Sequence, residues 1–222
     1  MFEIHVFVLP LDPSAEVAAA FSAACAGAGD APRMKGLLLR LDYEGRGFVG
    51  VLQSSRYVRG TLADAQRAAD EDAAVLAAAG FEVVRRKIEA VATSDGVPRT
   101  EADARGADPD RYFEFHLLIQ HREGPIPDEA VASLRTIARR TRAALGQPVP
   151  LSYNAMKPGQ RFLNLRTRGI GLDASMAHVR AIEDSVAATG ELDVVKVIAE
   201  YICADDNRAL DVGWLEPTLA AG

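Results

Sequence analysis

The sequence is poor in cysteine, in long apolar runs and in basic residues at its start. Its two cysteines, Cys25 and Cys203, cannot form the disulfide framework of a small secreted domain. It has no uninterrupted apolar run of about 18 residues, so no transmembrane helix is expected. An early acid, Glu3, and the lack of a basic first segment argue against a secretory signal. We therefore expect a cytoplasmic protein without a membrane partner.

Positive charge is scarcer than negative charge. The chain has 222 residues, with 25 Lys and Arg against 31 Asp and Glu, which gives a formal net charge of −6. This balance argues against nucleic acid or an anionic membrane as the main partner. Hydrophobic residues make up 49% of the sequence, enough to bury a core and to exclude general disorder. The length fits one large domain or two small ones, and the oligomeric state stays open.

Two stretches of the sequence correspond at a constant spacing. Phe2-Glu3-Ile4-His5 matches Phe113-Glu114-Phe115-His116, and the two histidines lie 111 positions apart. Glu89 and Glu200 keep the same offset. A spacing shared across half of the chain indicates an internal duplication.

The order of elements predicted in each half is strand–helix–strand–strand–helix–strand. This order is typical of a ferredoxin-like unit, with the helices on one face of a sheet. The sequence therefore predicts an α+β protein of two tandem ferredoxin-like (βαββαβ) pseudo-repeats packed as one body. The expected boundaries are 1–91 for the first repeat, 92–111 for a polar linker, 112–203 for the second repeat, and 204–222 for a C-terminal tail that packs on the body.

Polar side chains recur on the first and last predicted strands of each half. Because side chains alternate along a strand, Ile4 and Val6 belong under the helices, and Glu3 and His5 point to the other face. If the two sheet faces that the helices leave uncovered lie opposite each other, they enclose a charged cleft between the repeats. Ordinary cross-strand ion pairs on a solvated sheet explain the same pattern without a site.

The residue types in this predicted cleft suggest three roles. A histidine moves protons near neutral pH, so His5 and His116 are the predicted catalytic residues. Basic side chains bind anionic oxygens, and acidic side chains can hold a divalent ion such as Mg²⁺. The predicted substrate-binding residues are Arg85, Lys87, Arg166 and Lys196. The predicted metal ligands are Glu3, Glu89, Glu114 and Glu200.

Three functions stay open on this basis. The first is an enzyme of the phosphohydrolase or phosphoesterase type, acting on a small anionic, phosphorylated molecule with a divalent metal ion as the candidate cofactor. The second is a transition-metal enzyme that uses two histidines and two glutamates, His5, His116, Glu89 and Glu200. The third is a protein that binds a ligand or a partner without catalysis.

In architecture alone, two lobes around a charged groove resemble the triphosphate-tunnel and two-histidine phosphoesterase families. The residues at the motif positions differ, however. Phe7 and Leu118 stand where the phosphoesterases have a hydroxyl residue two places after each histidine. The first strand reads Glu3-Ile4-His5-Val6-Phe7, where the tunnel family has E-x-E-x-K. The metal alternative is similar in outline to the vicinal-oxygen-chelate enzymes. We assign the chain to none of these families.

Overall fold

A computed structural model describes residues 1–27, 33–43 and 46–215 of the chain. Its first elements are β1 (Phe2–Val8), α1 (Ala15–Ala26), β2 (Lys35–Tyr43), β3 (Gly47–Val58), α2 (Leu62–Ala78) and β4 (Val83–Val91). A short helix, α3 (Glu101–Arg105), leads to the second half. That half contains β5 (Tyr112–His121), α4 (Asp128–Leu145), β6 (Leu151–Asn154), β7 (Arg161–Thr167), α5 (Leu172–Ala187), β8 (Leu192–Asp205) and the 3-10 helix η1 (Arg208–Asp211).

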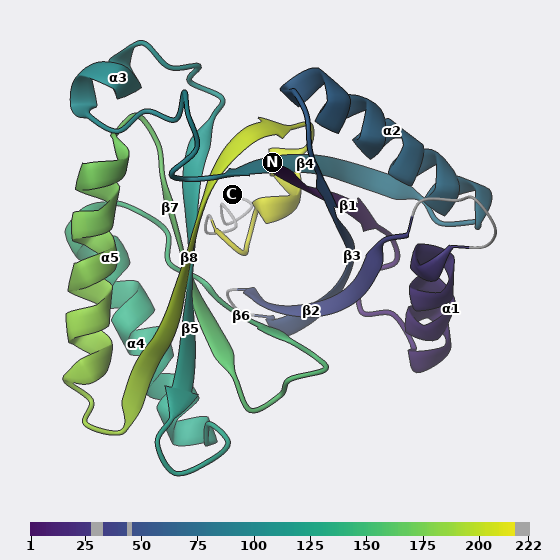
Figure 1. Ribbon diagram of the computed structural model, residues 1–222. Coiled ribbons are helices and arrows are strands. Elements are labelled where there is room, and N and C mark those ends of the chain that lie inside the picture. The colour runs from purple at the N-terminus through teal and green to yellow at the C-terminus, as the bar shows by residue number, and fades with distance from the viewer. Residues whose placement is uncertain (28–32, 44–45, 216–222) are drawn as a thin grey trace, which may run out of the picture.

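The strands form one closed antiparallel barrel in the order β1-β3-β2-β6-β7-β5-β8-β4. Two seams join strands from opposite halves of the chain. At one seam β2 pairs with β6, from Leu39 opposite Asn154 to Leu41 opposite Ser152. At the other seam β4 pairs with β8. In Figure 1, α1 and α2 lie outside the barrel on one side, and α4 and α5 lie outside it on the other.

The prediction of two tandem ferredoxin-like pseudo-repeats that face each other across a cleft is wrong. The eight strands share one continuous hydrogen-bonded sheet that closes on itself. Closure pairs the strand edges that the prediction left open, which is how barrels avoid exposed edges. The structure is therefore a single barrel and not a ferredoxin-like duplication. The strand faces that carry Glu3, His5, Glu114 and His116 line its interior.

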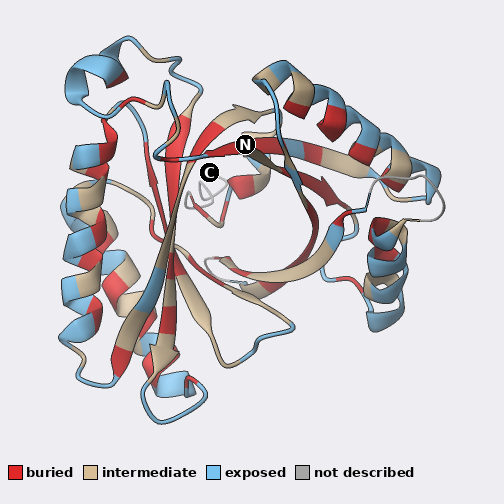
Figure 2. Ribbon diagram, viewed as in Figure 1, coloured by how far each residue is buried: buried red, intermediate tan, exposed pale blue. Residues whose placement is uncertain are grey.

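The outward faces of the strands are apolar and pack under the helices. In the first half, Ile4 and Val6 of β1 pack with Phe21 of α1 and Leu76 of α2, and all four are fully buried. Figure 2 shows the buried residues of the helices on the sides that face the sheet. A second cluster, in the other half of the chain, is built from Phe115, Leu117, Leu134, Val179 and Ile182.

The inward faces of the strands are mixed. Glu3 and His5 alternate with Ile4 and Val6 along β1, so they project into the barrel. A third apolar cluster fills another part of the interior, and Trp214 packs against it. Its buried members are Phe7, Leu41, Tyr43, Val49 and Val51.

Local sequence signals place the helix ends. The Thr61 hydroxyl accepts the Asp64 N–H at 3.2 Å, and the Asp64 carboxylate accepts the Thr61 N–H at 2.7 Å, which forms a capping box at the start of α2. Helix α4 ends at Gly146, whose φ of 65° is a left-handed conformation that glycine adopts at no steric cost.

Within the described residues, no helix is long and apolar enough to cross a membrane. The boundaries predicted for the repeats, the linker and the tail stay predictions. Of the predicted tail, residues 216–222 lie outside the described part of the chain.

One acid lies in the outer core. Asp72 of α2 is fully buried and pairs with Arg56, whose Nε donates to Asp72 Oδ2 at 3.0 Å. Burial raises the pKa of the Asp72 carboxyl to about 6, against the opposing effect of Arg56. Because the folded chain then holds the proton more tightly than the unfolded chain, Asp72 costs stability as pH rises through this range.

We expect Asp72→Asn to gain free energy of unfolding relative to wild type between about pH 4 and pH 7, since asparagine carries no charge to bury. Urea unfolding of both chains at pH 4.5 and pH 7 measures this difference. Asp70→Asn, on the exposed face of the same helix, is the control and should show no such trend. A wild-type-to-variant difference that stays constant with pH would contradict the assignment.

Candidate functional site

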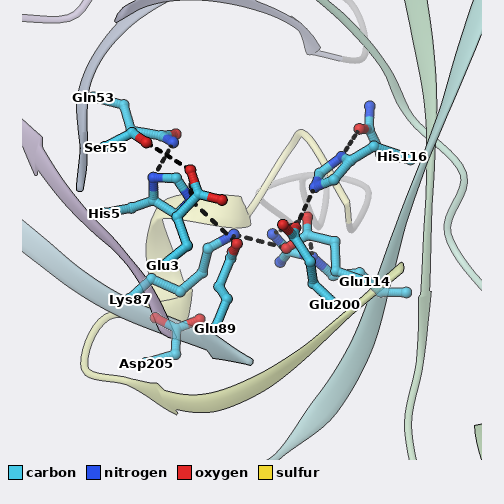
Figure 3. Close-up of polar contacts among 12 residues, drawn as sticks. Glu3, His5, Gln53, Ser55, Lys87, Glu89, Glu114, His116, Glu200 and Asp205 are labelled. Carbon is cyan, nitrogen blue, oxygen red and sulfur yellow. Dashed lines mark hydrogen bonds and ion pairs between the residues drawn. The ribbon is translucent and has the colours of Figure 1, made fainter. Parts of the chain in front are cut away.

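The charged side chains of the barrel interior converge on one cluster, which we call the interior cluster. Figure 3 shows the labelled acids, histidines and Lys87 pointing toward one another from strands of both halves. Strands β1 and β4 bring Glu3 opposite Glu89 and His5 opposite Lys87. The members of the cluster are Glu3, His5, Arg85, Lys87, Glu89, Glu114, His116, Arg166, Glu200, Asp205 and Asp211.

His5 is held by contacts on both ring nitrogens. Its Nδ1 lies 3.0 Å from the Ser54 carbonyl oxygen and 2.6 Å from Gln53 Nε2, both on β3. Its Nε2 lies 3.1 Å from Glu89 Oε2 and 3.7 Å from Glu3 Oε1. The backbone of β3 thus fixes the ring with Nε2 facing two carboxylates.

The two carboxylates beside His5 are themselves oriented. The Ser55 hydroxyl donates to Glu3 Oε1 at 2.6 Å. The Lys87 ammonium lies 2.6 Å from Glu89 Oε1, which leaves Oε2 toward His5. One ligand atom from each of Glu3, His5 and Glu89 falls within a group whose members all lie within 4.8 Å of one another.

A second histidine–carboxylate pair lies on the other side of the cluster. Asn164 donates through Nδ2 to the Pro150 carbonyl at 3.0 Å and to the Ser152 hydroxyl at 2.9 Å. Its Oδ1 therefore accepts from His116 Nδ1 at 2.6 Å. His116 Nε2 then faces Glu200 Oε2 at 3.3 Å, and the His116 side chain is 25% exposed.

The two pairs meet at Glu89 and Glu200, whose carboxyl groups influence each other's pKa. Burial, and then the charge of Glu89, raise the pKa of Glu200 to about 7. Enclosure lowers the pKa of His116, but the hydrogen bond to Glu200 and the nearby acids outweigh it and raise the pKa to about 9. For His5, burial lowers the pKa, but the charge and hydrogen bond of Glu89 outweigh burial, so the pKa is raised overall.

Each permanent cation of the cluster already has acidic partners. Lys87 Nζ lies 2.7 Å from Glu114 Oε2, in addition to its contact with Glu89. Arg166 donates to Glu114 Oε1 at 3.0 Å through Nε and also pairs with Asp211. Both oxygens of Glu114 are therefore occupied by cations, and its predicted role as a metal ligand stays a prediction.

Arg85 is paired in the same way. It donates to Asp205 at 2.8 Å through Nε and to Asp211 at 2.8 Å through Nη1. The substrate-binding roles predicted for Arg85, Lys87 and Arg166 stay predictions, and what the geometry shows is acid pairing. Lys196 is exposed on β8, and none of the ion pairs among the described residues includes it.

Acidic groups outnumber permanently charged basic groups inside the barrel. Six carboxyl groups face three permanent cations, Arg85, Lys87 and Arg166, in this interior cluster. Buried charges are costly unless they are balanced. Among the histidines and carboxyl groups of the cluster, the pKa is raised for His5, His116 and Glu200, and protons on these three groups would supply the missing positive charge.

The sequence did not identify two of the acids as part of this cluster. Asp205 ends β8, and Asp211 belongs to η1, beyond the expected second repeat. The Tyr112 hydroxyl donates to Asp205 at 2.7 Å, so the aromatic start of β5 also takes part. The Asp-rich segment after the last strand was the signal in the sequence, and it specifies no contact.

No protein-family model matches this sequence, and no curated protein matches it either. Among solved structures, the chain is similar to a provisionally named monooxygenase from Fusobacterium nucleatum, at 12% identity and a TM-score of 0.36, over 93% of this chain and 94% of that one. A provisionally named monooxygenase from Lactobacillus acidophilus gives 12% identity and a TM-score of 0.32, over 93% of each chain. TM-scores this low carry no argument, so the site is interpreted from its own geometry.

We expect Asp211→Ala to lower the free energy of unfolding by about 3–5 kcal/mol, because it leaves two buried guanidinium groups without their shared partner. Urea unfolding at neutral pH measures the loss. The matched control is Asp110→Ala, which removes an exposed pair with Arg208 and should change stability by less than about 0.5 kcal/mol. Equal effects of the two substitutions would show that Asp211 does not balance buried charge.

Proposed function

We propose that this protein is a metal-dependent enzyme that binds a divalent transition-metal ion inside the barrel through Glu3, His5 and Glu89. The carrying observation is the spacing of the three side chains. His5 Nε2 lies 3.1 Å from an oxygen of Glu89 and 3.7 Å from one of Glu3. Donors that bind one ion from about 2.1 Å are separated by roughly 3.0–3.4 Å at right or tetrahedral angles. The spacing supports a shared ion after small adjustments.

The outer contacts of these side chains support the same proposal. Histidines that bind metals almost always donate their other ring N–H to a carbonyl or a carboxylate, which fixes the ring. The Nδ1 of His5 lies 3.0 Å from such an acceptor, the Ser54 carbonyl, and 2.6 Å from Gln53 Nε2. Ser55 orients Glu3, and Lys87 contacts the Glu89 oxygen that faces away from His5.

The charge of the interior cluster also favours a cation over an anion. An ion with two positive charges would replace two of the protons that now balance the excess of carboxyl groups, as metal binding commonly does. A mixed set of imidazole and carboxylate ligands suits Zn, Fe, Mn or Ni. Mg²⁺ prefers oxygen ligands alone and fits this set less well.

His116 supports a catalytic role beside the proposed ion. Its side chain, at 25% exposure, is the most open of the interior cluster, and Nε2 points to Glu200. It is therefore the residue placed to exchange a proton with a small polar molecule that enters from solvent. This assigns His116 to proton transfer and His5 to metal binding.

Hydrolysis of a phosphorylated substrate, the first function that the sequence predicted, gains no specific support from the interior cluster. Arg85, Lys87 and Arg166 each contact two carboxylates. An anion entering the barrel would have to displace those partners, and a buried acid left unpaired is costly.

We expect chelator-treated protein to bind one Zn²⁺ or Mn²⁺ per chain in isothermal titration calorimetry. His5→Ala should weaken binding by at least about tenfold, because it removes a ligand that positions the ion. Glu3→Gln, at a more open position, should weaken binding in the same direction. His178→Ala is the matched control, since His178 lies on α5 outside the barrel, and it should bind like wild type.

Circular dichroism and thermal unfolding of each variant separate loss of the site from loss of the fold. Wild type that binds neither ion, or His5→Ala and Glu3→Gln chains that bind like wild type while folded, would refute the metal proposal. His116→Ala decides between two ligand sets. It should keep the ion if Glu3, His5 and Glu89 hold it, and it should lose the ion if the site uses two histidines and two glutamates.

A further inference from the structure

A cavity of about 800 Å³ lies where α4 passes the ends of β2, β3 and β6 and the C-terminal segment. Cavities of roughly 300–1,000 Å³ are the usual size of small-molecule sites. None of the described residues that line it belongs to the interior cluster, which it borders through the contact of Trp214 with Arg166.

One wall of this cavity is basic. Arg135, Arg139 and Arg142 line it from α4. Residues three and four positions apart lie on one helix face, so these three guanidinium groups follow one stripe. Arg135 forms a two-point pair with Asp42, at 2.6 and 2.9 Å. Among the described residues, no carboxylate lies within ion-pair distance of Arg139 or Arg142.

The cavity also has an apolar lining. Val149, Leu151 and Leu215 are buried and line the cavity. Trp214 also lines it; its indole N–H donates to the Leu151 carbonyl at 3.2 Å, and the Arg166 guanidinium lies 5.3 Å from its ring centre. A held aromatic ring beside aliphatic side chains suits a flat apolar group.

We propose that this cavity binds a small organic anion that carries a planar apolar body. Arg139 and Arg142 would bind its carboxylate, sulfonate or phosphate group, because guanidinium groups form two parallel charge-assisted hydrogen bonds to such oxygens. Trp214 and the aliphatic wall would contact the apolar body. A ligand with both a charged group and apolar surface matches a lining that contains both arginines and apolar side chains.

The test uses the fluorescence of Trp214, which is the only tryptophan of the chain. The probe is 8-anilinonaphthalene-1-sulfonate, an aromatic anion that quenches tryptophan by energy transfer. We expect saturable binding to wild type. The double substitution Arg139→Gln and Arg142→Gln should weaken binding by at least about tenfold, since it removes charged hydrogen-bond donors.

Arg140→Gln is the matched control, because Arg140 lies on the other side of α4, beside Ser185, and does not line the cavity. It should bind the probe like wild type. The neutral analogue N-phenyl-1-naphthylamine should bind more weakly than the anion, and inorganic phosphate should compete only weakly because it lacks an apolar body.

Equal binding of the anion to wild type and to the folded double variant would overturn the proposal, as would equally tight binding of the neutral analogue. Competition by inorganic phosphate at the affinity of the aromatic anion would overturn the part assigned to the apolar wall. The outcome is independent of the metal site, because His5→Ala leaves each lining residue of the cavity unchanged.

Discussion

Arg85 and Arg166 come from opposite halves of the barrel and share one carboxylate, Asp211, which the C-terminal segment carries to them. Both guanidinium groups are at most 4% exposed. A charge in such a place is tolerated only when another charge meets it. The barrel interior therefore depends on a segment that lies beyond the last strand, and the position of that segment depends on the two arginines.

The same requirement for balance explains why the histidines and glutamates meet. Strands β4 and β8 pair across the seam with Ala90 opposite Tyr201, so Glu89 and Glu200 are diagonal neighbours on the inner face. Burial and the charge of Glu89 raise the pKa of the Glu200 carboxyl. His5 and His116 stand at the outer ends of this pair. A charged interior is costly for stability alone, and its excess of acid is what makes a metal ion a reasonable occupant.

The interior cluster and the cavity beside α4 have opposite electrostatic characters. The interior cluster has more carboxyl groups than permanent cations, whereas the cavity has three arginines and Asp42. The sequence predicted an anionic ligand for the residues of the interior cluster, and the charge of the cavity lining is the reason that an anion is proposed there instead. The interior cations are already paired with acids, which residue composition does not reveal.

The sequence by itself determined which side chains share a face of each strand. The alternation of Glu3 and His5 with Ile4 and Val6 determined which side chains face away from the helices, because a strand has a period of two. The constant spacing to Glu114 and His116 showed that two strands carry the same pattern. Only the tertiary structure decided that these faces line one closed barrel, since the bonds between Leu39 and Asn154 join backbone groups that no residue pattern encodes. The partners of Arg85, Lys87 and Arg166 were decided there too, because ion pairs across a barrel depend on strand register and closure rather than on the order of residues along the chain.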